Sequence, residues 1–200
     1  ADHLEEDIDL IIKATKETKS SAKFRSLLAI ILKLGNKLNE GTAKESAAGF
    51  KMSGLVKLTE TKTNRGETLL DYVVTSMIEN MKEMLEVVDD FPHVNGASRK
   101  SFGTLKAAMT KLQGMAKITD GALNKIQQED ESEDYIGMQG LLDFFTEAEE
   151  RLTAIQEKYK EMELGFRALC KYLGEEGETA EPQQLFGTLT HFVGSLRSAK

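Results

Sequence analysis

The sequence predicts an all-α protein, in the form of an elongated helical bundle with a long antiparallel coiled-coil hairpin. Three observations favour this fold class. Apolar residues recur at steps of three and four along nearly the whole chain, whereas strand-like alternation is missing. Only two prolines interrupt the 200 residues. An unbroken heptad pattern, at about 1.5 Å per residue, predicts a helix much longer than a globular core is wide.

Two helices are expected before the first loop. The first ends near Lys19, and Ser20 or Ser21 can cap the second. Ile30 and Leu32 lie off the main apolar stripe of the second helix, which indicates that it is covered on more than one side. The first stripe consists of Leu4, Ile8, Ile11 and Ile12, and the second of Phe24, Leu27, Leu28, Ile31, Leu34 and Leu38.

Shorter elements follow up to residue 95. Residues 55–58 form a short apolar turn, and Thr68 opens another helix that includes Val73 and Val74. Pro92 and the pair Asn95-Gly96 then interrupt the chain, because both favour turns.

Two long segments form the predicted hairpin. The acidic stretch Glu129–Glu133 lies between them and is the expected turn, and a last helix starts at Pro182, where proline suits a first helical turn. The first seam consists of Phe102, Leu105, Met109, Leu112, Ala116, Thr119, Leu123 and Ile126. The second consists of Leu141, Phe145, Ala148, Leu152, Ile155, Tyr159, Met162, Phe166, Leu169 and Leu173.

Charge and composition exclude several function classes. The net charge is −7, so no global field attracts nucleic acid or an anionic membrane. No apolar run approaches the roughly 20 residues that cross a bilayer, so we expect no membrane insertion. Cys170 is the only cysteine, which excludes an internal disulfide and favours a reducing, cytoplasmic compartment.

The residue types that perform catalysis are scattered, so we expect no enzyme, no cofactor and no metal. His3, His93 and His191 do not share metal-ligand spacing. Cys170 follows a seam residue and is interpreted as a packed side chain. Ser20-x-x-Lys23 resembles a hydrolase pair, but companion motifs are missing, and Ser20 is interpreted as a helix cap.

The stretch from Leu34 to Phe50 is unusual because it combines three glycines with two asparagines. Gly41 can end the helix in the left-handed conformation, which explains part of the pattern. Gly35 lies inside the helix at a cost of about 1 kcal/mol relative to alanine, which favours close approach of another chain segment. Asn36 and Asn39 share a face and can bridge to the backbone of the following loop. A helix end and a supported loop of this kind are typical of a surface that binds another molecule.

These residues resemble the signature of the formin homology 2 domain, and the resemblance covers nearly the whole chain. The segment from Thr68 to Tyr72 looks like that family's Thr-Leu-Leu-His-Tyr/Phe motif, although it arrives about one residue early. Ala97-Ser98-Arg99 and the long heptad helices match in order. The specific part reads Gly35-Asn36-x-x-Asn39-x-Gly41, then Gly49-Phe50, then Leu55-x-Lys57-Leu58-x-x-Thr61-Lys62.

The resemblance implies binding to actin at the growing barbed end of a filament, with nucleation by the complete domain, and a place in the cytoskeleton. In this family a lysine of the Lys-Leu-x-x-Thr-Lys segment contacts actin, and Lys57 and Lys62 are the matching positions. Lys51 and Arg65 extend them to a basic patch on an acidic chain, which suits acidic actin. Taken singly, each of these cations is equally well explained as solvated surface.

The resemblance also implies a second subunit. In this family an N-terminal lasso wraps the post of a partner, and aromatic anchors of the lasso enter a groove beside the Gly-Asn segment. The matching positions here are Gly35, Asn36, Asn39, Gly41, Gly49 and Phe50.

The domain organisation expected from this family is a single partial domain. Residues 1–95 are post-like helices with the Gly-Asn loop, 96–176 are the long coiled-coil helices, and 177–200 are a terminal helix. We expect the lasso, the linker and most of the knob to be absent, since the chain has no tryptophan. With only two prolines, the proline-rich segment that recruits profilin-actin is also expected to be absent. Without the lasso, the linker and most of the knob, this portion alone is expected not to nucleate filaments.

One alternative from another class stays open. The chain can be a helical scaffold or coiled-coil tether with no actin activity. The cationic character of Lys57 and Lys62 distinguishes the two hypotheses, because a scaffold has no need for it.

Overall fold

A computed structural model describes residues 1–42, 46–129 and 135–199 of the chain, and the predicted all-α class is confirmed. Within these ranges the only β-type pairing is an isolated bridge between Lys62 and Thr68. The elements are α1 (Asp2–Ser20), α2 (Ala22–Leu38), α3 (Ser53–Glu60), α4 (Leu69–Asn80), the 3₁₀ helix η1 (Lys82–Asp89), α5 (Val94–Ala97), α6 (Phe102–Glu129), α7 (Tyr135–Tyr172) and α8 (Pro182–Ala199).

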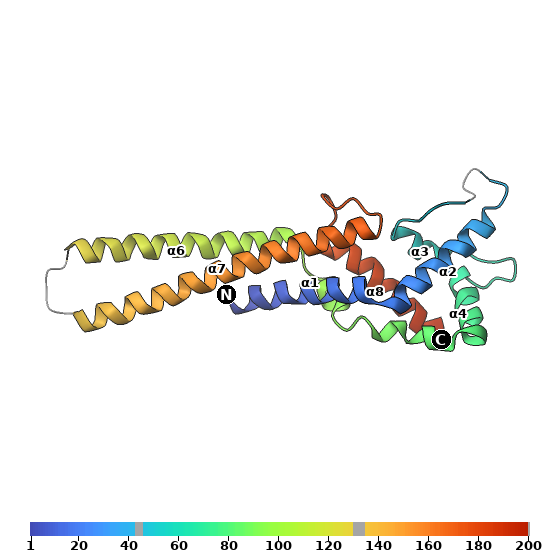
Figure 1. Cartoon of the computed structure of the whole chain (residues 1–200), viewed down its shortest axis with the longest axis horizontal. Helices are drawn as coiled ribbons and strands as arrows, with labels where there is room; N and C mark the ends of the chain where they lie inside the picture. The colour runs from blue at the N-terminus through green and yellow to red at the C-terminus, as the bar shows by residue number, and fades with distance from the viewer. Residues whose placement is uncertain (43–45, 130–134, 200) are drawn as a thin grey trace.

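The molecule is elongated, as predicted, because α6 and α7 run antiparallel as one long hairpin (Figure 1). The expected turn at Glu129–Glu133 falls largely on residues 130–134, which lie outside the described part of the chain. Helix α1 lies along α7 (Figure 1). Helices α2, α3 and α4 lie near the C-terminal part of α8, at the end of the molecule away from the long hairpin (Figure 1).

The contact between α1 and α7 joins an apolar stripe to a line of charged pairs. Ile8 and Ile11 are fully buried in this contact region. Lys158 of α7 donates to Glu5 at 3.0 Å, and Arg151 pairs with Asp2 and Glu5. Hydrogen bonds from Lys158 and Arg151 lower the pKa of Glu5. These groups are partly exposed, so they set the register of the two helices more than they stabilise them.

The prediction of one long helix is confirmed by α7, but the apolar seam of the hairpin is buried unevenly along its length. Leu105 and Met109 are buried where α1 also covers the hairpin. Farther along, Leu141 is 44% exposed and Thr119 is exposed, while Leu123 is buried. Two helices alone cover each other's seam less completely than three, and α1 packs only on the proximal part.

A cluster of aromatic rings fills the core where α6, α7 and α8 meet. The ring of Phe166 on α7 is fully buried and lies edge-on to Phe102 at 5.2 Å and to Phe186 at 5.6 Å, measured between ring centroids. Edge-to-face packing of this kind adds to the hydrophobic stabilisation of burial. The predicted start of the last helix at Pro182 is confirmed.

Two helix starts depend on hydroxyl caps. The interpretation of Ser20 as the cap of α2 is wrong, because the Phe24 amide donates to Ser21 Oγ at 2.9 Å, while Ser20 only donates to Glu17 O at 3.4 Å. Ser21 is the residue with extended backbone that an N-cap needs. The predicted start at Thr68 is confirmed by a reciprocal capping box with Asp71.

Candidate functional site

The Gly-Asn corner is built by the end of α2 and the loop after it. The side-chain amide of Asn36 donates from Nδ2 to Ala47 O at 3.0 Å, and the backbone amide of Ala47 donates to Asn36 Oδ1 at 2.9 Å. The predicted bridge from Asn36 to the loop backbone is therefore confirmed. The role of Asn39 differs, because it ends the helix and its carbonyl accepts from Thr42. Gly41 adopts a φ of 78°, the left-handed conformation expected at such an end.

Gly35 is helical, and a Cβ placed on it would meet no atom within 4 Å. The expected close approach of another segment is therefore not found among the described residues. Gly49 likewise has open space at its Cβ position. Both glycines leave room on the outside of the molecule, so internal packing does not explain them.

A groove of about 540 Å³ opens next to this corner, between α2, the segment after the loop and the C-terminal end of α7. Gly49 and Phe50, two of the predicted site residues, line it. Gly35, Asn36, Asn39 and Gly41 are not among the lining residues; they shape the loop that leads to Gly49. The other lining residues are Arg25, Leu28, Ala29, Leu32, Lys51, Met52, Lys171, Tyr172, Leu173 and Gly174.

Contacts across the groove hold its walls together. The Met52 amide donates to Glu175 Oε1 at 2.7 Å, which ties the loop segment to the chain after α7. Arg25 Nε donates to the Tyr172 hydroxyl at 3.1 Å, which ties α2 to the last turn of α7. Since the two walls come from distant parts of the sequence, these bonds set the width of the groove.

The free cysteine belongs to α7 and is enclosed by the core. Cys170 is fully buried, and burial, followed by the charge of Glu175, raises the pKa of its thiol to about 11. A thiol that stays protonated is a weak nucleophile and metal ligand. The interpretation of Cys170 as a packed side chain agrees with this environment.

The predicted actin-binding cations divide into two groups. Lys57 lies in the last turn of α3, and Lys62 and Arg65 lie on the turn that follows it. All three are exposed and none forms a salt bridge to another described residue. Lys51 lies instead at the groove, where it approaches Glu176 at 3.7 Å.

The turn that carries Lys62 and Arg65 has a defined backbone. The Thr63 amide donates to Glu67 O at 2.7 Å, and the Leu69 amide donates to Thr61 O at 2.9 Å. Gly66 closes the turn with a φ of 86°. The two cations are therefore presented on a short, hydrogen-bonded hairpin rather than on a loose loop.

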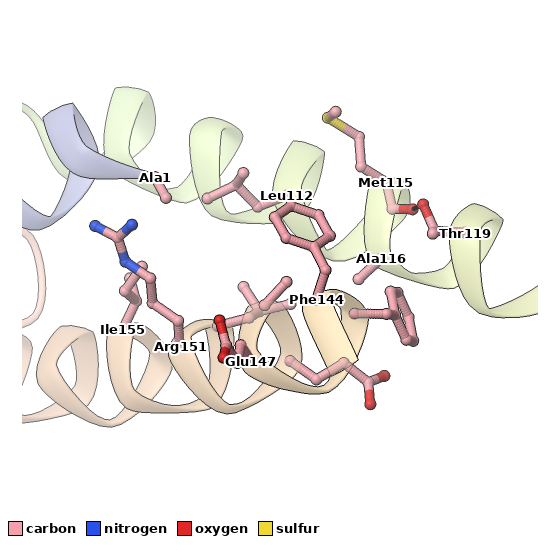
Figure 2. A pocket seen from close by; sticks show the side chains of 13 residues that line it. Ala1, Leu112, Met115, Ala116, Thr119, Phe144, Glu147, Arg151 and Ile155 are labelled. Atoms are coloured by element: carbon pink, nitrogen blue, oxygen red, sulfur yellow. Dashed lines mark hydrogen bonds between the residues drawn. The ribbon is translucent and has the colours of Figure 1, made fainter. Parts of the chain in front are cut away.

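A second groove, of about 400 Å³, lies between α6 and α7 beside Ala1 (Figure 2). Leu112 and Met115 line it from α6, and Phe144, which is 69% exposed, lines it from α7. Its lining is mainly hydrocarbon, with the carboxylates of glutamates at the edge. Such a surface suits contact with another apolar surface better than it suits chemistry.

Some of the remaining polar side chains that the structure describes are placed in contacts between helices. In the described ranges no group of three or more histidine, cysteine or acidic side chains is placed to hold a metal ion. His93 pairs with Glu17 and also donates its amide to that carboxylate at 3.2 Å, which joins α1 to α5. Where helices are described, none has the length and apolar character needed to cross a membrane.

The sequence indicates one wall of the groove, formed by Gly49 and Phe50, but not the wall formed by the end of α7. Leu32 could be recognised as a lining residue, because an apolar side chain off the main stripe of α2 needs a second contact surface. Arg25 and Tyr172 gave no such signal, because nothing local indicates that the last turn of α7 meets the first turns of α2.

Comparisons with known proteins identify the sequence pattern. Residues 1–197 match the family model described as Formin Homology 2 Domain. The chain is 32% identical to Formin-like protein 14 of Arabidopsis thaliana over 195 residues, or 96% of this chain and 16% of that protein. It is 30% identical to Formin-like protein 3 of Oryza sativa subsp. japonica over 206 residues, which cover 100% of this chain and 16% of that protein. It is 29% identical to Protein diaphanous of Drosophila melanogaster over 191 residues, which cover 93% of this chain and 17% of that protein. The chain thus spans about a sixth of the length of these relatives.

Proposed function

Because the chain belongs to the formin homology 2 domain family, we propose that it is an actin-binding region of a formin. The complete domain nucleates actin filaments and remains on the growing barbed end, and its place is the actin cytoskeleton. The observation that carries the proposal is the set of exposed cations Lys57, Lys62 and Arg65, which α3 and the turn after it present on one part of an acidic chain.

The proposed contact with actin is electrostatic. Lys57, Lys62 and Arg65 are exposed cations on α3 and the hydrogen-bonded turn after it, with no salt bridge to other described residues. Lys51 extends the set toward the groove. Exposed cations on a chain of net charge −7 are well suited to meet an acidic partner, because complementary charge speeds and orients association.

The proposed contact with a second subunit is the groove. Phe50 and Gly49 line it directly, while Gly35, Asn36, Asn39 and Gly41 shape the adjoining corner. An aromatic anchor of the partner's lasso can enter between α2 and the end of α7, since the lining is largely hydrocarbon. Profilin-actin is then an indirect partner, delivered by a proline-rich segment outside this chain.

Reversal of two charges tests the actin contact. Lys57→Glu combined with Lys62→Glu replaces attraction by repulsion at two exposed sites, so we expect affinity for actin filaments to fall by about tenfold or more at low salt. Co-sedimentation of the purified chain with filaments measures the change. Melting temperature should hardly move, because exposed charges contribute little to stability.

The matched control is Lys106→Glu with Lys160→Glu, which changes net charge equally on exposed positions of α6 and α7. It should retain most of the affinity. If both double variants bind filaments as the parent does, the assigned cations are wrong. If the parent itself does not bind filaments, the scaffold hypothesis becomes the better one.

A further inference from the structure

The turn between α3 and α4 is held at both ends by helix termini. Thr61 ends α3, and its amide donates to Lys57 O at 2.9 Å. Thr68 is the N-cap of α4, and across the turn the Leu69 amide donates to Thr61 O at 2.9 Å. Lys62 and Thr68 are paired in the isolated bridge. The backbone position of Lys62 therefore depends on how firmly Thr68 is held.

Asp71 holds Thr68 by three hydrogen bonds. Asp71 Oδ2 accepts from the Thr68 backbone amide at 2.9 Å and from the Thr68 hydroxyl at 2.7 Å. The Asp71 amide donates in return to Thr68 Oγ1 at 3.0 Å. The bonds to the carboxylate, above all the one from the side chain, lower the pKa of Asp71, so the group is ionised at neutral pH. A reciprocal capping box of this kind fixes the chain at the start of a helix.

The charge of Asp71 is not explained by the proposed contact with actin. Lys62 and Arg65 lie on the turn that Asp71 closes, and a carboxylate near them repels an acidic partner. Glu60 and Glu67 are acidic neighbours as well, and both side chains are exposed. Glu67 closes the turn through its backbone carbonyl, whereas Asp71 does so through its carboxylate. The position of Asp71 is explained if the carboxylate acts on the turn and not on the partner.

We propose that Asp71 is a positioning residue for the contact with actin. By holding Thr68, it keeps the turn in the form in which Lys62 and Arg65 meet the acidic partner. This inference rests on the proposed function and adds to it how the cations are presented. A turn that leaves this form binds only in proportion to the fraction of molecules that keep it. Preorganisation of the turn therefore increases affinity without any new contact.

The direction of one substitution decides between the two roles of the carboxylate. Asp71→Ala removes the two bonds to Thr68, so affinity for actin filaments should fall between about threefold and tenfold, the range in which the loss of one cap shifts a local equilibrium. Charge alone predicts the opposite sign, because removal of a carboxylate reduces repulsion of an acidic partner. Co-sedimentation of the purified chain with filaments measures the change.

Three further variants locate the effect. Asp71→Glu should restore the affinity, because glutamate at this position of a capping box makes the same reciprocal bonds. Asp71→Asn keeps the size of the side chain and should show a smaller loss of the same sign. Glu67→Gln is the matched control, since it removes the same charge from the same turn but keeps the backbone bond. It should bind as the parent does or more tightly. Circular dichroism of each variant shows whether helix content is retained.

Hydrogen exchange reports on the turn itself. The Thr63 amide donates to Glu67 O at 2.7 Å, and the Leu69 amide donates across the turn as described above. Both amides should exchange between about threefold and tenfold faster in Asp71→Ala, because local opening of the turn exposes them to water. Asp71→Glu should return both rates to those of the parent. Nuclear magnetic resonance of labelled chains resolves the two amides.

The other outcomes overturn the inference in distinguishable ways. Binding of Asp71→Ala that equals or exceeds that of the parent, while Lys57→Glu with Lys62→Glu weakens it, rejects the positioning role and keeps the cations. Unchanged binding of that double variant rejects the cationic contact, and the inference fails together with that part of the proposed function. Weaker binding of Asp71→Ala with unchanged exchange of both amides means that the carboxylate contacts the filament directly, so the positioning role is wrong.

Discussion

Ser21 connects two elements through one hydroxyl, so its removal should have an unusually large effect for a serine. The oxygen accepts the Phe24 amide at 2.9 Å and donates its own proton to Asp90 Oδ2 at 2.6 Å. The first bond caps α2, and the second joins α2 to the residue that ends η1. Ser21→Ala removes both bonds while leaving a backbone, at φ −62° and ψ 109°, that alanine adopts readily.

The expected loss follows from these two bonds. An N-cap serine contributes about 1 kcal/mol to stability. A hydrogen bond to a charged group contributes about 1.5–3 kcal/mol, and the lower end applies because Asp90 is only half-buried and water can replace the hydroxyl. The sum is about 2–3 kcal/mol of unfolding free energy. For a chain of this size that corresponds to a fall of about 4–12 °C in melting temperature.

Thermal and urea unfolding followed by circular dichroism measure this loss. Ser20→Ala is the matched control, because its exposed hydroxyl makes only a 3.4 Å contact with Glu17 O. It should change the melting temperature by less than about 2 °C. Ser21→Gly should fall between the two, since glycine at an N-cap costs only a few tenths of a kcal/mol while the bond to Asp90 is still lost.

Similar melting temperatures for Ser20→Ala and Ser21→Ala would refute the reasoning. They would mean that the cap and the bond to Asp90 contribute no net stability, or that the two serines share the role. A loss in Ser21→Gly as large as that in Ser21→Ala would assign the whole effect to Asp90 and none to the cap.

Two further predictions concern backbone freedom and pH. Gly35→Ala should raise the unfolding free energy by about 0.5–1 kcal/mol in urea titration, because the position is helical and its Cβ meets no atom within 4 Å; destabilisation would contradict this. Hydrogen bonds from the Thr68 side chain and then its backbone lower the pKa of Asp71 below its ordinary 3.8, so this stabilisation is present above about pH 4 and lost as pH falls through the lowered value. Thr68→Val should therefore melt with a weaker pH dependence than the parent in acid, and identical pH profiles would count against the capping box.

The sequence by itself determined the helical class, the helix starts at Thr68 and Pro182 and the position of the Gly-Asn corner. Each of these depends on neighbours within one or two turns. The three-to-four spacing of apolar residues, the hydroxyl of Thr68 and the left-handed conformation of Gly41 are local properties that a linear pattern records directly.

Choices between equivalent local signals were decided by tertiary contacts. Ser20 and Ser21 are both adequate caps by type, and Ser21 is used because Asp90, far along the chain, lies within reach of its hydroxyl. Along the hairpin one heptad pattern gives buried Leu105 and exposed Leu141, because α1 covers only the first of these regions. A heptad position therefore does not by itself determine how deeply its side chain is buried.

The groove is the clearest product of the tertiary structure. One wall is signalled by Gly49, Phe50 and the off-stripe Leu32, but the other consists of the last turn of α7, including Tyr172. Whether these walls meet depends on the packing of whole helices, since burial of their apolar faces sets where the helix ends lie. The sequence records which residues can line such a groove, and only the folded chain brings Arg25 within 3.1 Å of Tyr172.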